Sequence, residues 1–469
     1  MSSVATARVG LPSGLAVTGR LVRRTLGELA AVIQVLLGGA VVLAAAERPS
    51  VLTSAHKGAF TAWFAGPLRG LLPGLTRSQS MLERGLHGAL LAMLGAWLLV
   101  LLGGHTVRGG VIVGAVAALN AIFLLCPPLA LTDLFNYLGY ARLDVVHHLN
   151  PYVQLPVAQR SDPVYAYSNW HHLRSPYGPL FTLILLPTAK LPLAVAYWTY
   201  KVIATLASLG LLAAVWACAR RLGRPPVAAV AFVGLNPIVL VYALGGKHND
   251  VLMMACVMLG GLLILAGREA RGGVALAAAV AIKASAGLIA PVLALGARRP
   301  GRAVAGAAAG AVLFGALTLL AFGPHLPNVA DQDRLVNLWS VPNLLGFAAG
   351  HGGADAAVRR IATVAGLAGG AVCALVAWRT RHWETAAGWA ALIALASLSW
   401  LSAWYVLWVL PFAALSTSRT LRGATLAAVV SLVLVRTGTV PYLLHHFGAN
   451  VGHTAVWHTN HRFERTLLG

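Results

Sequence analysis

The chain has 469 residues, of which 58% are hydrophobic and only 10% are charged. Soluble globular domains carry about 25% charged residues, and the 13 acidic side chains here are too few to solvate a soluble protein of this size. Apolar runs near the ~20 residues that cross a bilayer as a helix recur along the chain. The composition therefore excludes a soluble enzyme and predicts an all-α, polytopic membrane protein.

The net charge of +22 comes from 35 basic and 13 acidic residues. The basic residues fall in short runs between apolar segments rather than on one polar module. This distribution follows the positive-inside rule, so we expect these runs and the N-terminus in the cytoplasm. A nucleic-acid partner is not expected, because the positive charge forms no single binding face. The runs are Arg20–Arg24, Arg220–Arg224, Arg268–Arg271, Arg298–Arg302 and Arg379–Arg381.

Between the N-terminus and residue 267, the apolar runs predict six full spans. Residues 47–85 are expected to form an outer loop with an interfacial stretch at Phe60–Leu75. Residues 130–177, the most polar and aromatic part of the chain, form a second outer loop by the same count. Residues 180–191 contain Pro187 and are too short to span, which indicates a re-entrant or interfacial helix. The predicted spans are 26–46, 86–104, 109–129, 197–218, 226–245 and 251–267.

Two later stretches do not fit single spans. Residues 273–297 have basic loops on both flanks and Lys283 in the middle, and a charge at the bilayer centre costs at least about 2.5–3.5 kcal/mol unless it faces a cavity or a partner. A broken helix pair that enters and returns satisfies both observations. Residues 385–415 are interpreted in the same way, with Ser399–Tyr405 at the outer turn. Full spans are expected at 303–323, 361–378 and 424–443, which gives about 11–13 membrane helices in a single domain, 1–469.

The cysteine and histidine patterns predict no metal site and no disulfide. Four cysteines lie in or beside apolar runs without a CxxC pair, which is typical of small packing residues. The C-terminal tail is rich in histidine and is expected outside, but its spacings match no zinc motif, so we interpret these as surface histidines. The residues are Cys126, Cys218, Cys256, Cys373, His445, His446, His453, His458 and His461.

Asp133 is the first acidic candidate for chemistry. It follows the third predicted span in "LTDLFNY" and is expected at or just below the outer interface, beside the apolar Leu131, Leu134 and Phe135. A general base needs such a position, ionised and sheltered from bulk water. The alternative is a helix cap, in which Thr132 or Asp133 begins a helix after two prolines. A cap and a base are not mutually exclusive.

A second polar turn, "KHND" at Lys247–Asp250, is expected to face the same compartment as Asp133. A polar tetrad that caps the next helix is the alternative, although one such residue is enough for a cap. Aromatic, histidine and arginine residues also crowd the loop 130–177, where sugars can stack on rings and phosphate can be held by cations. An aromatic interface belt with snorkelling cations is the alternative interpretation there, and it is favoured for Tyr197, Trp198 and Tyr200.

Taken in order, these segments resemble the GT-C superfamily of polyprenyl-phosphate-dependent membrane glycosyltransferases, in particular the actinobacterial α-1,6-mannosyltransferase family that builds lipomannan and related envelope glycans. The resemblance covers about 130–415. It rests on "DLFNY" at 133–137, "NPY" at 150–152, Trp170 with "SPYGPL" at 175–180, "HND" at 248–250, Lys283 and "WYVLWVLP" at 404–411. Many relatives have "DVY" where this chain has "DLF". The adjacent Asp-Glu pair of protein O-mannosyltransferases is missing, which argues against that branch.

The resemblance implies an inverting enzyme at the outer face of the plasma membrane. Asp133 then corresponds to the general base, and the partners are a polyprenyl-phosphate sugar, with mannose expected, a glycan or glycolipid acceptor and membrane lipids. No cofactor and no metal are implied. Arg142, Arg174, Lys247 and His248 are candidates for the lipid-phosphate clamp. The further candidates for donor or substrate binding are Tyr137, Asn150, Tyr152, Trp170, His171, His172, Tyr177, Asn249, Asp250, Lys283, Trp404 and Tyr405.

The sequence is also compatible with two other classes of protein. A polytopic transporter or lipid flippase also uses broken helices and an intramembrane charge, but it commonly shows matching halves, and no repeat is obvious here. A non-catalytic scaffold for envelope assembly would not depend on the Asp133 carboxylate. The sequence contains no Walker A motif and no dinucleotide-binding GxGxxG after a strand, so an ATP-driven pump and an enzyme with a soluble nucleotide-sugar domain are not expected.

Overall fold

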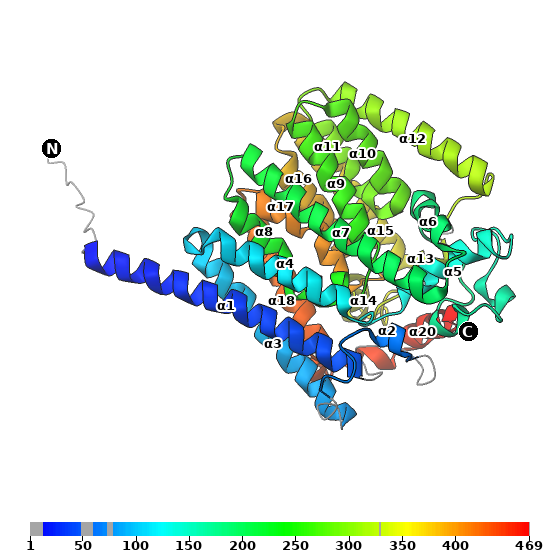
Figure 1. Ribbon diagram of the computed structural model, residues 1–469. Coiled ribbons are helices and arrows are strands. Elements are labelled where there is room, and N and C mark those ends of the chain that lie inside the picture. Colours follow the sequence, from blue (N-terminus) through cyan, green and yellow to red (C-terminus); the bar gives the residue numbers. More distant parts are fainter. Residues whose placement is uncertain (1–12, 48–59, 73–77, 328–329, 469) are drawn as a thin grey trace.

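The computed structural model describes residues 13–47, 60–72, 78–327 and 330–468, and over these residues it contains helices and no β-strand (Figure 1). This confirms the all-α, polytopic class. Five described helices are long and apolar enough to cross a membrane, and a sixth results if one bent pair is counted as a span. Shorter apolar helices lie among them, as expected for broken or re-entrant segments. The five long ones lie within Gly19–Glu47, Ser80–Gly103, Leu193–Arg221, Pro300–Phe322 and Ala356–Thr380.

The N-terminal part consists of α1 (Ser13–Glu47), which packs along α3 (Gln79–Gly103) and α4 (Gly109–Leu125). The short α2 (Ala62–Ala65) precedes α3, and η2 (Gly104–Thr106) follows it. At the close approach of α1 and α3, a Cβ on Gly27 or Gly103 would press against Val107. Small residues at such points let membrane helices approach closely.

The central part carries the loop 130–177 and the helices that follow it. α7 runs away from this loop and α9 returns beside it, and the two helices pack together. The elements are α5 (Asp133–Val145), η3 (Pro156–Gln159), η4 (Tyr165–Tyr167), α6 (Pro179–Leu185), η5 (Leu186–Thr188), α7 (Leu193–Arg221), α8 (Pro226–Gly234), the π-helix η6 (Val239–Leu244) and α9 (Asp250–Leu265).

The C-terminal half contains both predicted broken stretches. α10 ends at Ile282, the next residue Lys283 is extended (φ −153°, ψ 123°), and the chain returns through two short helices. α16 ends before residue 399, and η8 and α17 lead back. The elements are α10 (Glu269–Ile282), η7 (Ala284–Leu288), α11 (Ala290–Gly296), α12 (Pro300–Phe322), α13 (Ala330–Asp333), α14 (Val341–Ala348), α15 (Ala356–Thr380), α16 (Trp383–Ser397), η8 (Ala403–Trp408), α17 (Leu410–Leu415), α18 (Arg419–Arg436), α19 (Thr439–His446), η9 (Val451–His453) and α20 (Ala455–Leu468).

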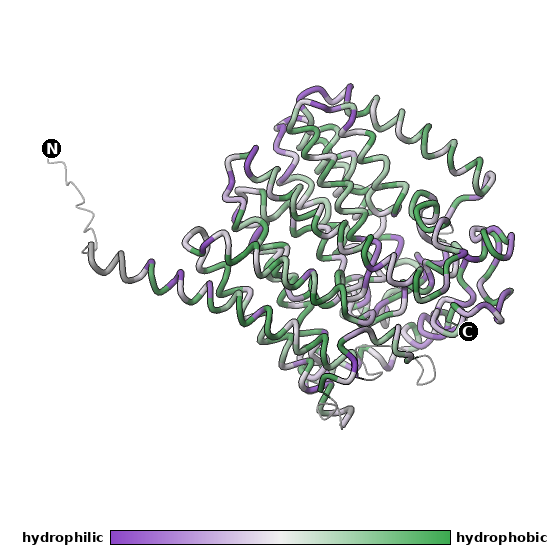
Figure 2. Tube along the Cα trace, in the orientation of Figure 1, coloured by the Kyte–Doolittle hydropathy of each residue, from purple (hydrophilic) through white to green (hydrophobic). Residues whose placement is uncertain are grey.

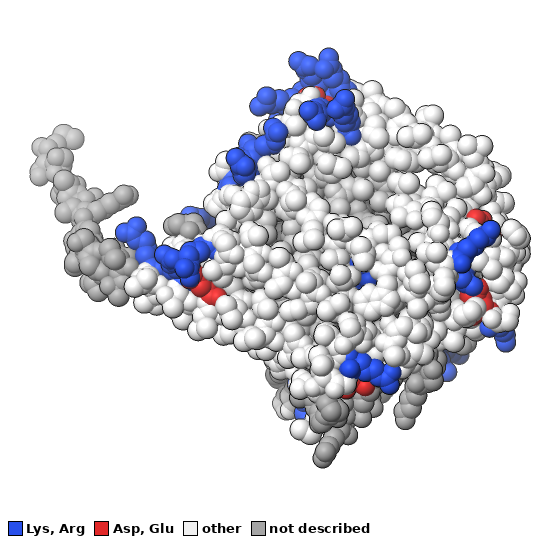
Figure 3. Space-filling model, viewed as in Figure 1, with Lys and Arg blue, Asp and Glu red and all other residues white. Residues whose placement is uncertain are grey.

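The predicted basic loops meet at one end of the helix bundle. Arg381 donates to the carbonyl oxygens of Leu295 and Ala297 at the end of α11. Arg224 donates to the carbonyl of Leu415 at the end of α17. In Figure 3, basic side chains gather along one edge, a broad face beside them is nearly free of charge, and basic and acidic side chains mix at the opposite edge. The same uncharged face is formed by hydrophobic helices in Figure 2.

Three segments differ from the sequence prediction. The expected span 226–245 is divided, because α8 ends at Gly234 and the π-helix η6 follows Pro237. The expected span 424–443 is bent by 76° between α18 and α19. Within the predicted interfacial stretch Phe60–Leu75, of which residues 73–75 lie outside the described residues, Phe64 is fully buried and stacks on Phe135, with ring centroids 5.6 Å apart. Aromatic packing against the loop therefore determines the position of α2.

We expect the contact between α10 and α12 to be sensitive to single methyl groups. A Cβ on Gly306 would overlap the carbonyl oxygen of Ala270, whereas Gly301 on the same helix has open space around its Cβ position. Gly306→Ala should therefore lower the stability of the folded protein by about 1–3 kcal/mol, the usual cost of overpacking. Thermal unfolding in detergent measures this effect. Gly301→Ala is the matched control, and equal stability of the two variants would contradict the packing described here.

Candidate functional site

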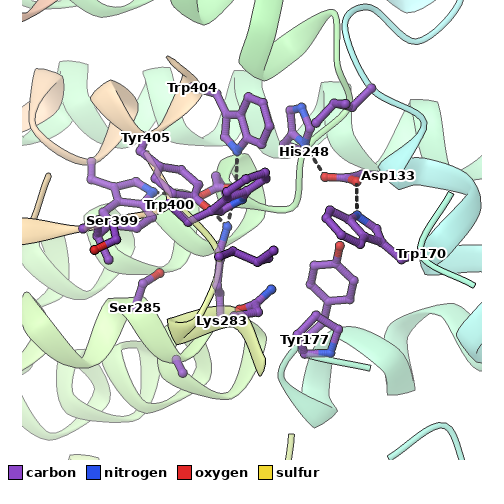
Figure 4. A pocket seen from close by; sticks show the side chains of 18 of the residues that line it. Asp133, Trp170, Tyr177, His248, Lys283, Ser285, Ser399, Trp400, Trp404 and Tyr405 are labelled. Carbon is purple, nitrogen blue, oxygen red and sulfur yellow. Dashed lines mark hydrogen bonds and ion pairs between the residues drawn. The ribbon is translucent and has the colours of Figure 1, made fainter. Parts of the chain in front are cut away.

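A cavity of about 390 Å³ lies at the end of the bundle opposite the basic loops. Segments that are distant in sequence form most of its lining: the start of α5 with its following loop, the turn before α9, the break after α10, the α13 region, and η8 with the stretch that leads into it (Figure 4). Polar side chains lie beside one another here because they come from helix starts and helix breaks. Continuous helices would not bring these side chains together. The residues that line it with polar or ring groups include Asp133, Tyr137, Trp170, Tyr177, His248, Asp250, Lys283, Ser285, Gln332, Ser399, Trp400, Trp404, Tyr405 and Trp408.

Asp133 is the first residue of α5, and its side chain borders the cavity. Its Oδ1 accepts hydrogen bonds from Trp170 Nε1 and Asn136 Nδ2, each 3.3 Å away. Its Oδ2 lies 3.3 Å from His248 Nδ1. Thr132, the residue before the helix, makes no side-chain cap. Asp133 thus occupies the first turn, where the helix dipole favours a negative charge, while its carboxylate faces the cavity.

Asp250 begins α9 in the same manner, and Asn249 before it makes no side-chain cap. Both carboxylate oxygens of Asp250 accept hydrogen bonds from Lys283 Nζ, at 2.9 and 2.8 Å. Trp408 Nε1 donates to Oδ1 (2.7 Å) and Trp404 Nε1 donates to Oδ2 (3.1 Å). A buried ion pair is tolerated when further hydrogen bonds satisfy it, as here. The capping interpretation of this turn therefore does not describe the role of the Asp250 side chain.

Trp404 connects the two carboxylates. Its indole stacks on the His248 ring, with centroids 3.5 Å apart and planes 7° apart, while its N–H donates to Asp250. His248 is buried, and within the described part of the chain neither of its ring nitrogens has a hydrogen-bond partner. The imidazole is therefore held in place by stacking, with Nδ1 directed at Asp133.

The other two residues of the 247–250 turn point away from the cavity. Lys247 has a positive φ of 58° and donates from Nζ to the carbonyl of Phe123 (2.8 Å). Asn249 is fully buried, and its backbone N–H lies 3.4 Å from the hydroxyl oxygen of Tyr137, which accepts. The structure thus places Lys247 and Asn249 behind the cavity wall, and Tyr137 between that wall and the cavity.

Arg142 stabilises the outer loop and does not line the cavity. Its guanidinium donates to both carboxylate oxygens of Asp162 (2.9 and 3.0 Å) and to the carbonyl of Ala189 (2.8 Å). Burial alone would raise the pKa of Asp162, but the hydrogen bonds from Arg142, the Val164 N–H and His147 hold that pKa below its usual value. This contribution to loop stability is present at neutral pH and is lost as the pH falls through that lowered pKa.

Several other predicted binding residues lie outside the cavity. Asn150 donates to the carbonyl of Phe322, and the Tyr152 hydroxyl bonds with Thr182 (2.9 Å). His171 stacks on Tyr165, with ring centroids 3.9 Å apart. The remaining two are His172, whose backbone N–H donates to Leu467, and Arg174, which is exposed. Among the described residues, no group of three or more His, Cys, Asp or Glu side chains is placed to hold a metal ion.

Several polar or ring groups that line the cavity were not among the predicted site residues, including Ser285, Gln332, Ser399, Trp400 and Trp408. Asn136, which donates to Asp133, was not predicted either. Trp400, Trp404 and Trp408 recur at every fourth residue, and this spacing could have grouped Trp408 with the other two. Its bond to Asp250 could not be predicted, because Trp400 lies outside any helix and Trp408 ends the 3-10 helix η8, so only the fold brings Trp408 to Asp250. Ser285 carries no such signal, because its position depends on the irregular backbone after Lys283.

Comparison with known proteins identifies relatives. A family model described as the N-terminal domain of α-(1→6)-mannopyranosyltransferases matches residues 25–299. The chain is 32% identical over 231 residues to α-(1→6)-mannopyranosyltransferase A of Mycobacterium tuberculosis. The aligned region covers 47% of this chain and 43% of the relative. The chain is 27% identical over 191 residues to α-(1→6)-mannopyranosyltransferase A of Corynebacterium glutamicum, covering 39% of this chain and 38% of the relative.

A third relative, a probable α-(1→6)-mannopyranosyltransferase of Mycolicibacterium smegmatis, is 30% identical over 157 residues, or 31% of this chain and 27% of the relative. The chain therefore spans less than half the length of these curated relatives. No solved structure matches it. Asp133, Asp250 and Lys283 all lie within the residues that the family model matches.

We expect the Asp250–Lys283 pair to show strong coupling in a double-mutant cycle. Asp250→Asn or Lys283→Gln alone leaves a buried charge without its partner, which costs about 3–5 kcal/mol. The double variant removes both charges, so its loss of stability should be smaller than the sum of the two single losses. Unfolding of the four proteins in detergent measures the coupling, and additive losses would contradict a direct ion pair.

Proposed function

Because the chain belongs to the α-(1→6)-mannopyranosyltransferase family, we propose that it transfers mannose from a polyprenyl-phosphate donor to a glycan or glycolipid acceptor of the cell envelope. The observation that carries this proposal is the Asp133 carboxylate at the cavity wall, held by Trp170 and Asn136 and facing His248. A positioned carboxylate beside a sheltered cavity is the group that such a transfer requires.

In the proposed reaction, Asp133 takes the proton of an acceptor hydroxyl as the oxygen attacks the anomeric carbon. A bond forms between that oxygen and the anomeric carbon, and the bond from the carbon to the phosphate oxygen breaks. The polyprenyl phosphate leaves with the electron pair. Attack from the face opposite the leaving group inverts the anomeric centre in one displacement, so no second carboxylate nucleophile is needed.

Lys283 is the cation we assign to the departing phosphate. Its side chain is 17% exposed and borders the cavity, while Asp250 holds the ammonium in position. A fixed cation stabilises negative charge as it develops on the leaving group. Asp250 then acts as a positioning residue, together with the Trp404 and Trp408 indoles that bind it. Arg142 and Lys247, which the sequence suggested for the phosphate, lie outside the cavity and carry no part in this assignment.

We further propose that the cavity faces the exterior and that the basic loops face the cytoplasm. The support is the charge asymmetry between the two ends of the bundle, which follows the positive-inside rule. The transporter alternative finds less support, since the polar groups gather at one end of the bundle around one cavity.

The test of the base is Asp133→Asn, which keeps the shape of the side chain and removes its proton affinity. Loss of a general base lowers kcat by about 10²–10⁴-fold. Transfer of labelled mannose from a polyprenyl-phosphate donor to acceptor, by purified wild type and variant, measures this change. Asp144→Asn is the matched control, because Asp144 lies on the same helix and does not line the cavity. Unchanged transfer by Asp133→Asn would remove Asp133 from its proposed role.

Orientation is tested separately, with single cysteines at two exposed arginines. Arg160 lies in the loop at the cavity end, and Arg302 lies in the first turn of α12, among the basic residues at the other end. We expect a membrane-impermeant maleimide to label Arg160→Cys in intact cells and Arg302→Cys only after permeabilisation. The reverse pattern, or labelling of both in intact cells, would contradict the proposed topology.

A further inference from the structure

One corner of the cavity is formed by residues beyond 299, where the family match ends. We call it the Trp400 corner and define it by three lining residues: Gln332 on α13, Leu335 just after α13, and Trp400 before η8. The backbone N–H of Asn337 donates to the carbonyl of Ser399 (2.8 Å), which joins the two segments that carry these residues. The corner is therefore built by the C-terminal part of this chain, outside the matched region.

The Trp400 corner offers a ligand neutral polar groups and an aromatic ring. Among the described residues of 330–335 and 397–400, none that lines the cavity is Lys, Arg, Asp or Glu. Gln332 and Trp400 are partly buried, and within the described chain neither the Gln332 amide nor the Trp400 N–H has a hydrogen-bond partner. A sugar matches such a lining, because its hydroxyls both donate and accept and its C–H face is apolar. A phosphate would find no cation there.

A short series of contacts connects this corner to the proposed base. Trp400 meets Trp170 edge to face, with ring centroids 6.3 Å apart. Trp170 Nε1 in turn donates to Asp133 Oδ1 (3.3 Å), and Leu335 packs with Trp170 in one apolar cluster. Figure 4 shows Trp400, Trp170 and Asp133 around the same cavity. A ligand on the Trp400 ring is therefore separated from Asp133 by about the width of one indole.

The cation assigned to the donor phosphate lies at another part of the cavity wall. Lys283 Nζ lies 4.7 Å from the ring centroid of Tyr405 and 5.7 Å from that of Trp408. Trp400 is not among its contacts in the described chain. The cavity thus has a charged part at Lys283 and an uncharged part at the Trp400 corner, which suits two substrates of different chemistry.

We propose that the Trp400 corner binds the acceptor, as an uncharged hexose stacked on the Trp400 ring and hydrogen-bonded to Gln332. This inference rests on the proposed function and adds to it the place and the chemical class of the acceptor. A hexose seated there presents a hydroxyl to Asp133 while Lys283 holds the donor phosphate. An acidic group is disfavoured at the corner, because it would lose water without gaining a cation.

Three variants separate stacking from simple packing. Trp400→Leu keeps apolar contact with Leu335 and Trp170 but has no ring, whereas Trp400→Phe keeps a ring and loses the N–H. Gln332→Ala removes the amide alone. The matched control is Trp339→Leu, because Trp339 is partly buried in the segment that follows α13 and does not line the cavity.

Steady-state transfer is measured with a polyprenyl-phosphate mannose donor and a short α-(1→6)-linked mannoside acceptor. We expect Trp400→Leu to raise KM for the acceptor about fivefold, the result of losing a ring contact, while KM for the donor changes less than about twofold. Trp400→Phe should recover most of this loss, and Gln332→Ala should raise the acceptor KM about threefold. Trp339→Leu should leave both KM values unchanged. Equal shifts in the two KM values, equal losses in the two Trp400 variants, or no shift in either would overturn the assignment.

A binding measurement separates failure of the corner from failure of the proposed function. Saturation-transfer NMR of free α-(1→6)-mannobiose on the solubilised protein should show binding by wild type, weaker binding by Trp400→Leu, and no competition by polyprenyl phosphate. Competition by polyprenyl phosphate, or binding of an octyl mannoside without binding of mannobiose, would place a lipid at the corner and overturn the proposal. Binding that depends on Trp400 without any mannose transfer would instead contradict the proposed reaction and leave the sugar site standing.

Discussion

The buried ion pair between Asp250 and Lys283 is the interaction on which the site depends. It joins the start of α9 to the break after α10, and the Trp404 and Trp408 indoles complete the shell around the carboxylate. Without a partner, Lys283 could not stay at this depth in a membrane protein. Because Asp250 pairs with Lys283, the irregular backbone after α10 is stable inside the protein. The cavity forms at this break.

The two carboxylates at the cavity have divided roles because their surroundings differ. Asp250 receives four hydrogen bonds from a cation and two indoles, so its charge is committed to structure. Asp133 receives longer hydrogen bonds from neutral groups and has no lysine or arginine among its partners in the described chain. Of the two carboxylates, Asp133 is therefore the one that we propose as the base. Trp404, which stacks on His248 and binds Asp250, links Asp250 to the histidine that faces Asp133, the proposed base.

Much of this arrangement could be predicted from the sequence where a local signal existed. The break at Lys283 followed from basic loops on both flanks of one apolar run, and the outer turn near Ser399 followed from the same reasoning. Asp133 was identified because acidic residues are so few. The roles of Arg142 and Lys247 could not be predicted, since each depends on a distant partner: Asp162 for the first and the Phe123 carbonyl for the second. A π-helix just before Lys247 changes the direction in which that side chain points, and hydrophobic periodicity gives no sign of it.

The C-terminal helix α20 has a practical consequence for handling the protein. Leu467 packs in a small apolar cluster with Trp170, Leu173 and Leu335, and its carbonyl accepts the backbone N–H of His172. Two members of that cluster, Trp170 and Leu335, also line the Asp133 cavity. An affinity tag or fluorescent fusion placed after α20 would therefore emerge beside the Asp133 cavity, where it would obstruct access to the residues that line it. The beginning of α1 lies far from this region (Figure 1), so purification handles belong at that end.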